Sequence, residues 1–421
     1  MQAAIRAFIV DCTPTHQQED ANAWASRITG VGNIIGYLSG FVYLPNYLPF
    51  LGDNQFKVLV AIACIVLAST LIMSCLCVGE RDSRLLGEPF NHGTGVLSFS
   101  RSLIRSVRRL SPQIRKVCQV QIFAWIGWFP FLFYTSTYVG GIYAEPFFAE
   151  NPNMTDTEID MVWERGTRLG SLALLTFAIA TFTASVVLPW IITPSYRPVE
   201  GIKATALVPT PTTPASLDTL TPRRSEDGYF AHKPVSRSVW DSPTSRFLAR
   251  FSLSRIQIPY LTLRRAWLFS HLLFALLTWC TLLVRSTIGA IVLVGAVGIP
   301  WALTNWAPFA LIAAEISKRD AIRRGLRPAP RRRDGEILAQ PEYGGDPSAD
   351  QAGVVLGIHN VAIAAPQVVA TLVSSVIFKF LQKPRGATGD NSIAWVLRFG
   401  GLCALGAAWM TRRVGEGEED E

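Results

Sequence analysis

The stretch QVQIFAWIGWFPFLFYTSTYVGGIY (119–143) decides the fold, because it runs through apolar and aromatic residues without one charged side chain. An α-helix needs about 20 such residues to cross the hydrocarbon core of a bilayer. Residues 1–10 have the composition of the end of another span. Further blocks of this apolar kind follow one another along the chain: 23–48, 56–78, 168–193, 265–286, 287–316, 353–378 and 392–410. The pattern predicts an all-α, polytopic membrane protein.

The composition agrees with this prediction and excludes several other classes. Hydrophobic residues make up 49% of the 421 and charged residues only 17%, which is too apolar for a typical soluble protein. The net charge of +8 comes mainly from the loops, which indicates membrane topology rather than nucleic-acid binding. The chain has no ATP-binding loop and no HExxH, GxSxG or CxxC motif. We therefore expect no enzyme, no cofactor and no bound metal, and an ion gradient or the solute's own gradient rather than ATP as the energy source.

Lysine and arginine alternate between rich and poor loops. Segments 79–117 and 317–352 carry eight each, and 194–264 carries more. Segment 49–55 carries none, and 144–167 carries only Arg165. Because basic loops stay in the cytoplasm, the alternation predicts cytoplasmic positions for the three rich segments and for the tail 412–421.

Small residues and prolines interrupt several of the apolar blocks. Gly32, Gly36 and Gly40 recur at every fourth position, which predicts a flat ridge for close helix packing. We expect Pro300 and Pro308 to interrupt 287–316, and Pro366 to interrupt 353–378. Helix breaks at membrane depth are typical of carriers and pores, in which neighbouring helices or a water-filled cavity satisfy the freed backbone groups.

Ionisable residues inside the blocks are candidate sites, because each costs several kcal/mol unless it has a partner or a cavity. Arg6 offers five rigid donors for hydroxyl or carboxylate oxygens, and its alternative role is a structural pair with Asp11 or with another helix. Asp11, Glu315 and His359 are candidate proton-coupling residues, and His359 lies on an apolar span beside Asn360. An anchor at the membrane interface is the alternative for the four residues near helix ends: Asp11, Arg27, Arg168 and Glu315.

Several strings resemble sucrose carriers of the glycoside-pentoside-hexuronide group within the major facilitator superfamily, of the fungal sucrose and α-glucoside type. IRAFIVD (5–11) and ANAWASRITGVGNIIGYLSG (21–40) are similar to the fourth and fifth spans of that family. Matches to its seventh, eighth, tenth and eleventh spans follow: QIFAWIGWFPFLFYTSTYVG (121–140), GTRLGSLALL (166–175), GIPWALTNWAPFALIAAEIS (298–317) and GIHNVAIAAPQVV (357–369).

The resemblance implies two six-helix halves, a long central cytoplasmic loop and symport of a disaccharide with a proton. It implies that Arg6 reaches the sugar and that Arg168 matches an arginine at the mouth of the eighth span. A cavity is expected between the halves, lined by Asn33, Trp128, Asn305, Asn360 and Gln367 by position and chemistry. Ring faces such as that of Trp128 would stack on the apolar faces of a sugar, although aromatics are equally common in interfacial belts.

The same resemblance divides the chain into four parts. These are a remnant of the N-terminal bundle (1–78), the central loop (79–118), a C-terminal six-helix bundle (119–411) and an acidic cytoplasmic tail (412–421). The C-terminal bundle contains a long loop, 194–264, whose Pro, Ser and Thr content predicts disorder over much of its length. The first three spans, part of the fourth and the upstream carboxylate thought to exchange the proton in plant relatives have no counterpart in this sequence.

The leading hypothesis is therefore a fragment of a proton-coupled importer of sucrose or a related α-glucoside, with the lipid bilayer, protons and a maltose-like or sucrose-like disaccharide as its partners. We expect it in the plasma membrane, with the vacuolar membrane as the alternative. Residues 1–421 are expected not to transport sucrose by themselves. The competing hypothesis is a truncated paralogue that does not transport but associates with a full-length carrier. The sequence assigns no oligomeric state.

Overall fold

The computed structural model describes residues 18–77, 110–193, 258, 260–323 and 352–415. This part of the chain is helical, and its one β pairing is an isolated bridge between Thr193 and Thr262. The prediction of an all-α polytopic protein is confirmed. The α-helices are α2 (Gln18–Phe41), α3 (Gln55–Cys77), α5 (Pro112–Glu150), α6 (Asp156–Ile191), α8 (Leu263–Trp279), α9 (Thr287–Arg323), α11 (Ala352–Ala364), α12 (Pro366–Leu381) and α13 (Ser392–Thr411).

Each apolar block in the described part of the chain contains a helix. Among the described residues, seven segments are long and apolar enough to cross a membrane, with α11 and α12 together forming one of them. The block 23–48, predicted to be a span, is not among the seven, because α2 carries polar residues such as Arg27 and Asn33. Its helix ends at Phe41 rather than 48, and two short 3₁₀ turns, η2 (Leu44–Asn46) and η3 (Pro49–Leu51), follow.

Side-chain caps set where several helices begin. Ser111 caps α5, since its hydroxyl accepts a hydrogen bond from Ile114 N at 3.4 Å, and Pro112 opens the helix where no backbone donor is needed. Thr155 and Glu158 form a reciprocal capping box at the start of α6. These caps satisfy backbone N–H groups that have no partner within the helix.

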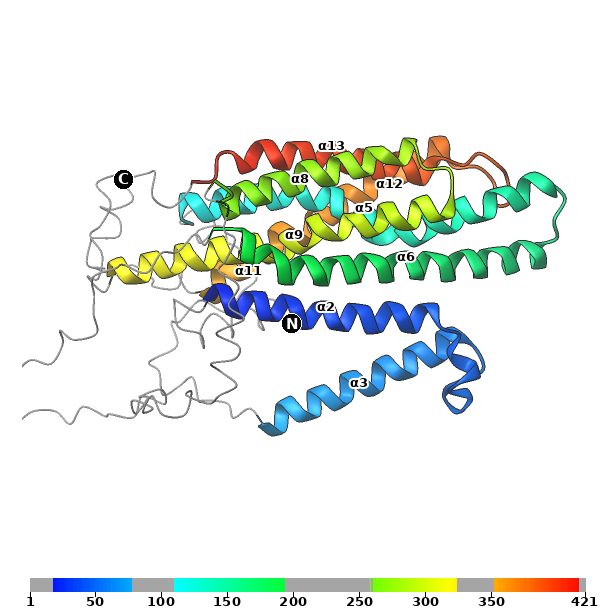
Figure 1. Cartoon of the computed structure of the whole chain (residues 1–421), viewed down its shortest axis with the longest axis horizontal. Helices are drawn as coiled ribbons and strands as arrows, with labels where there is room; N and C mark the ends of the chain where they lie inside the picture. The colour runs from blue at the N-terminus through cyan, green and yellow to red at the C-terminus, as the bar shows by residue number, and fades with distance from the viewer. Residues whose placement is uncertain (1–17, 78–109, 194–257, 259, 324–351, 416–421) are drawn as a thin grey trace, which may run out of the picture.

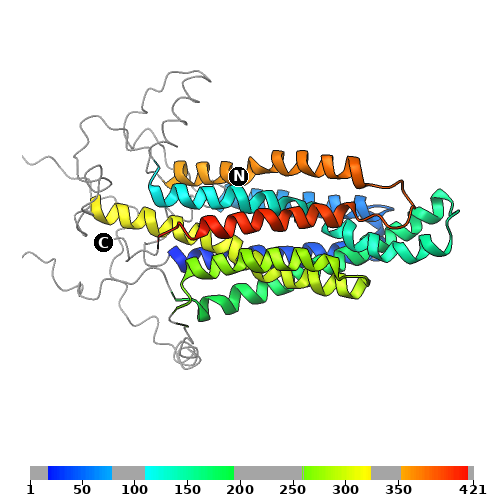
Figure 2. The same ribbon diagram turned by 90° about the horizontal axis from the view of Figure 1, so that it is seen from above.

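The helices run side by side along one axis, and α3 splays away at the edge of the group (Figures 1 and 2). α2 packs against α6 and α9, whereas α5 contacts α6, α9, α11, α12 and α13. The helix ends at Cys77, Ile191 and Arg323 lie at one end of the group, and the short links 42–54, 151–155 and 382–391 lie at the other (Figure 1). The three arginine-rich segments therefore attach at a single end, which agrees with the alternation in the sequence.

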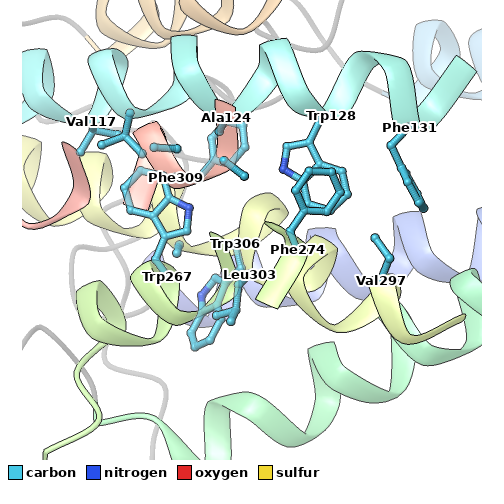
Figure 3. Packing of buried hydrophobic residues seen from close by; sticks show 14 of the residues in the cluster. Val117, Ala124, Trp128, Phe131, Trp267, Phe274, Val297, Leu303, Trp306 and Phe309 are labelled. Carbon is cyan, nitrogen blue, oxygen red and sulfur yellow. The ribbon is translucent and has the colours of Figure 1, made fainter. Parts of the chain in front are cut away.

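The core lies between α5, α8 and α9. In Figure 3, Trp128 and Phe131 extend from α5 toward Phe274 of α8 and Val297 of α9. The Trp128 and Phe274 rings stack with centroids 4.0 Å apart, and Phe131 meets Phe274 edge-on at 5.9 Å. Such aromatic pairs contribute about 0.5–1.5 kcal/mol beyond the area they bury. They join α5 to α8, two helices that are distant in sequence.

Glycines allow two helices to approach until their backbones touch. On α5, a Cβ added to Gly127 would collide with the carbonyl oxygen of Gly400 on α13, and one added to Gly400 would lie 2.8 Å from the oxygen of Gly127. A β-carbon at either position requires the helices to move apart. This contact fixes how closely the last span sits against α5.

The structure corrects two expectations and confirms a third. Pro300 and Pro308 do not interrupt their block, because α9 continues through both while neighbouring helices pack along it. Pro366 does divide its block, since α11 ends at Ala364 and α12 begins at the proline. The prediction that the glycine ridge of α2 packs closely is wrong for two of its three members within the described part of the chain. A Cβ at Gly32 or Gly36 meets no described atom within 4 Å.

Some predictions concern residues outside the described ranges. These are the terminal piece 1–10 with Arg6, the neighbouring Asp11, most of the central loop 79–118, the disorder predicted within 194–264 and the end of the acidic tail. They stay predictions, as does the division of the chain into two halves.

The α5–α13 contact gives a direct test. Gly400→Ala should lower the thermal unfolding temperature of the purified protein, because overpacking of this kind costs roughly 1–3 kcal/mol. Gly36→Ala adds the same methyl group where space is open, and should leave the temperature unchanged or raise it, since alanine favours helix by about 1 kcal/mol. Equal effects of both substitutions would contradict the close contact.

Candidate substrate-binding site

An aromatic cluster joins the middle of α5 to α9 and α6. Trp301 of α9 lies at its centre, with ring centroids 4.8 Å from Trp128, 5.7 Å from Trp125 and 6.1 Å from Phe177. Asn305 lies one turn further along α9, and its amide nitrogen donates to the Trp301 carbonyl at 3.1 Å. Two residues of the predicted site, Trp128 and Asn305, thus each contact Trp301, the first through its ring and the second through the backbone carbonyl.

The members of this cluster differ in exposure. Trp128 is only 1% exposed, and Phe274 covers one face of its ring, so in this structure it is a core residue rather than a surface one (Figure 3). Trp125 and Trp301 are half-buried and pack onto the core from its border. The ring surface left for a ligand thus belongs to these two tryptophans, with the half-buried Asn305 beside them.

The site predicted from the sequence does not include Trp125 and Trp301. The available signal is spacing: Trp301 and Asn305 are four residues apart, so they share one face of α9, and Trp125 precedes Trp128 by almost one turn. The sequence shows that Trp125 and Trp128 are neighbours within one apolar block and that Trp301 and Asn305 are neighbours within another. It does not show which of them Phe274 covers.

A buried polar pair links α11 to α5. Gln121 Nε2 lies 3.0 Å from His359 Nε2, and both residues are at most 1% exposed. An amide nitrogen only donates, so His359 Nε2 accepts, and the imidazole is neutral in this arrangement. Phe309 of α9 meets the imidazole edge-on at 4.9 Å. His359 is thus held on two sides by residues of other spans.

Asn360 and Gln367 lie on either side of the helix break at Pro366. Asn360 is half-buried and Gln367 is exposed, so both amides are partly free of the bundle core. The break itself leaves the backbone near Pro366 without a regular hydrogen-bond ladder. That these amides and the tryptophans face one ligand stays a prediction.

The remaining candidates lie near the helix ends. Arg168 of α6 donates from Nε to the Phe41 carbonyl at 3.4 Å, and its guanidinium lies 6.0 Å from the Tyr43 ring centroid. It therefore joins α6 to the end of α2, on which Asn33 is half-buried. Glu315 accepts from Ser111 Oγ at 2.8 Å and pairs with Arg319 at 3.1 Å, which connects α9 to the start of α5. Arg6 and Asp11 lie outside the described residues.

Comparison with known proteins identifies the family, although no family model matches the chain. A general α-glucoside permease of Schizosaccharomyces pombe is 32% identical over 98% of this chain and 70% of its own length. The chain belongs to the sucrose and α-glucoside transporter family of the major facilitator superfamily. It is an integral membrane transporter protein and not an enzyme.

Other relatives match shorter parts of the chain. The MFS-type transporter cctQ of Talaromyces islandicus is 31% identical over 38% of this chain and 54% of its own length. The rice sucrose transport protein SUT2 is 27% identical over 44% of this chain and 38% of its own length. The similarity to the fission-yeast permease, in contrast, extends over nearly the whole 421-residue chain.

The buried pair predicts a specific loss of stability. Gln121→Leu removes the hydrogen bond from Gln121 Nε2 to His359 Nε2 in a site that water does not reach, which should cost roughly 1–3 kcal/mol. Gln119→Leu is the matched control, because Gln119 is exposed on the same helix and should tolerate leucine in a lipid environment. Thermal unfolding in detergent measures both, and a larger loss for Gln119→Leu would contradict the pairing.

Proposed function

We propose that this chain forms part of a secondary active transporter that carries sucrose or a related α-glucoside together with protons across the plasma membrane. The observation that carries the substrate class is the border position of Trp125 and Trp301 beside Asn305. The names of the relatives, an α-glucoside permease and sucrose transport proteins, support the same class. We assign α2 and α3 to one half of such a carrier and the helices within 119–411 to the other.

The chemistry of this cluster suits a disaccharide. Each pyranose ring has apolar C–H faces that stack on tryptophan and hydroxyl groups that need donors and acceptors. Asn305 supplies an amide, and the Trp125 indole N–H is buried without a hydrogen-bond partner among the described residues. A sugar hydroxyl that reached this N–H would satisfy it. Asn33, Asn360, Gln367, Arg168 and Arg6 are the further polar groups that we assign to the substrate path.

Of the proton-coupling candidates Asp11, Glu315 and His359, we favour His359. Protonation turns its Nε2 from an acceptor into a donor, and Gln121 can then keep the bond only if its amide rotates to present Oε1. Gln121 Oε1 is buried and accepts no hydrogen bond from the described residues. The pair therefore has two arrangements that differ by one proton, which is the kind of two-state element that a coupled carrier requires.

Sugar binding tests the substrate assignment. We expect maltose or sucrose to change the tryptophan fluorescence of the purified chain in detergent, and Trp301→Ala and Asn305→Ala to weaken the apparent affinity about tenfold each. Trp395→Ala is the control, because Trp395 is 45% exposed on α13 and does not belong to the cluster. The substrate assignment fails if Trp395→Ala is as damaging as Trp301→Ala, or if neither sugar binds.

The proton assignment is tested by the pH dependence of sugar affinity. His359→Gln keeps a side chain that can hydrogen-bond Gln121 but does not titrate, and it should flatten that dependence. Glu315→Gln should preserve it, because Glu315 is engaged by Ser111 and Arg319 at a helix end. If the pH dependence of sugar affinity is flat in Glu315→Gln and normal in His359→Gln, Glu315 rather than His359 is the proton-coupling residue.

Vesicles test transport itself. The expectation that residues 1–421 do not transport sucrose by themselves stays a prediction, and labelled-sucrose uptake into vesicles that contain only this chain tests it. Uptake driven by an inward proton gradient would refute that expectation while supporting the proton-coupled function. Sugar binding without uptake would agree with the expectation and with the proposed function.

A further inference from the structure

A cavity lies apart from the aromatic cluster, at the end of the group where α5 leads into α6 and α12 leads into α13. Its volume is about 270 Å³, and it is enclosed by the end of α5, by the turn η6 (Cys280–Leu282) and the residues after it, and by the start of α13. By the loop charges this is the outer face of the membrane. Its polar lining comprises Thr137, Tyr138, Glu145, Thr281, Arg285, Asp390 and Asn391.

The inner wall of this cavity holds polar groups that the fold leaves incompletely satisfied. Tyr138 is 7% exposed, and its hydroxyl is buried without a hydrogen-bond partner among the described residues. Arg398 of α13 is 5% exposed and donates from Nε to Thr281 Oγ1 at 3.0 Å, directly behind the lining. Arg398 lies six residues into α13, about 9 Å below its start. A cation and a free hydroxyl at this depth favour a ligand that brings oxygen atoms.

The mouth of the cavity carries charges of both signs. Arg285 is exposed there, and no described carboxylate forms an ion pair with it. Glu145 accepts a hydrogen bond from Gly389 N at 2.7 Å, and Asp390 accepts one from Ser392 N at 2.9 Å. The two carboxylates are thus fixed in place by the backbone. They disfavour a simple anion and favour a ligand that combines a negative group with a positive one.

The surroundings of the cavity belong to the membrane interface. Leu282 and Leu283, which precede Arg285, are 52% and 79% exposed, and Trp395 beside Arg398 is 45% exposed. Apolar side chains with a tryptophan at the end of a span are typical of the level where acyl chains meet headgroups. The acyl chains of a lipid can pack against these exposed apolar side chains, whereas a soluble polar ligand gains nothing from them.

We propose that this cavity binds the headgroup of a zwitterionic phospholipid of the outer leaflet. The phosphate binds Arg285 and the Tyr138 hydroxyl with the charge of Arg398 behind them, and the ammonium group lies toward Glu145 and Asp390. The acyl chains run along the exposed leucines. Such a lipid would join α5, η6 and α13 at the outer end of the bundle, and this role is independent of the sugar assignment.

Thermal unfolding of the purified full chain tests the site. Phosphatidylethanolamine or phosphatidylcholine should raise the unfolding temperature more than phosphatidylglycerol does. Arg285→Gln should weaken the apparent lipid affinity about tenfold, as expected for loss of a charged hydrogen bond. Tyr138→Phe should weaken it by a smaller factor. Tyr134→Phe is the matched control, because Tyr134 lies one turn before Tyr138 on α5 but packs against Phe378 and does not line the cavity. This substitution should leave the lipid effect unchanged.

The remaining outcomes each overturn the proposal. Equal stabilisation by anionic and zwitterionic lipids would remove the role of the two carboxylates. Phosphoethanolamine as effective as the whole lipid would make the source a soluble phosphate ester, and maltose as the better stabiliser would make the cavity a sugar site. An unchanged lipid effect in both Arg285→Gln and Tyr138→Phe would place the lipid elsewhere.

Discussion

The hydrocarbon core of a bilayer offers no water to hydrogen-bond the peptide groups, and the rest of this structure depends on that constraint. Each span must satisfy its own backbone, so the apolar blocks become helices over nearly their whole length. Polar side chains then need partners from other helices. Arg398 and Thr281, and Gln121 and His359, are such pairs, and each joins two spans that are far apart in sequence. The constraint that creates the helices therefore also selects where they are joined.

Close packing decides which aromatic residues remain available to a ligand. Trp125, Trp128 and Trp301 have the same chemistry and lie within one cluster. Phe274 reaches Trp128 from α8 and stacks on it, which converts that tryptophan into core. The other two stay at the border. The backbone contact of Gly127 with Gly400 also depends on close packing, because it leaves no room for a side chain between α5 and α13.

The surroundings also give the titratable groups different roles. Glu315 is engaged at a helix end by a serine and an arginine, so it stabilises the junction of α9 with α5. His359 has an amide partner that can adopt two orientations. This contrast makes His359 the better candidate for coupling, although both residues are equal candidates in the sequence. The outer cavity adds a third environment, in which fixed carboxylates face an exposed arginine.

The sequence by itself determined the helices and the alternation of basic loops, because both follow from local composition and from the length needed to cross a bilayer. It also pointed to Pro366 as a break, since a proline removes a backbone donor wherever it occurs. It was wrong for Pro300, Pro308 and the ridge of Gly32 and Gly36, whose effects depend on what packs beside them. Only the tertiary structure decided that Trp128 is buried whereas Trp301 is half-buried, that Gln121 meets His359, and that Tyr138 lines a cavity. These are contacts between distant spans, and no periodicity within one helix specifies its neighbours.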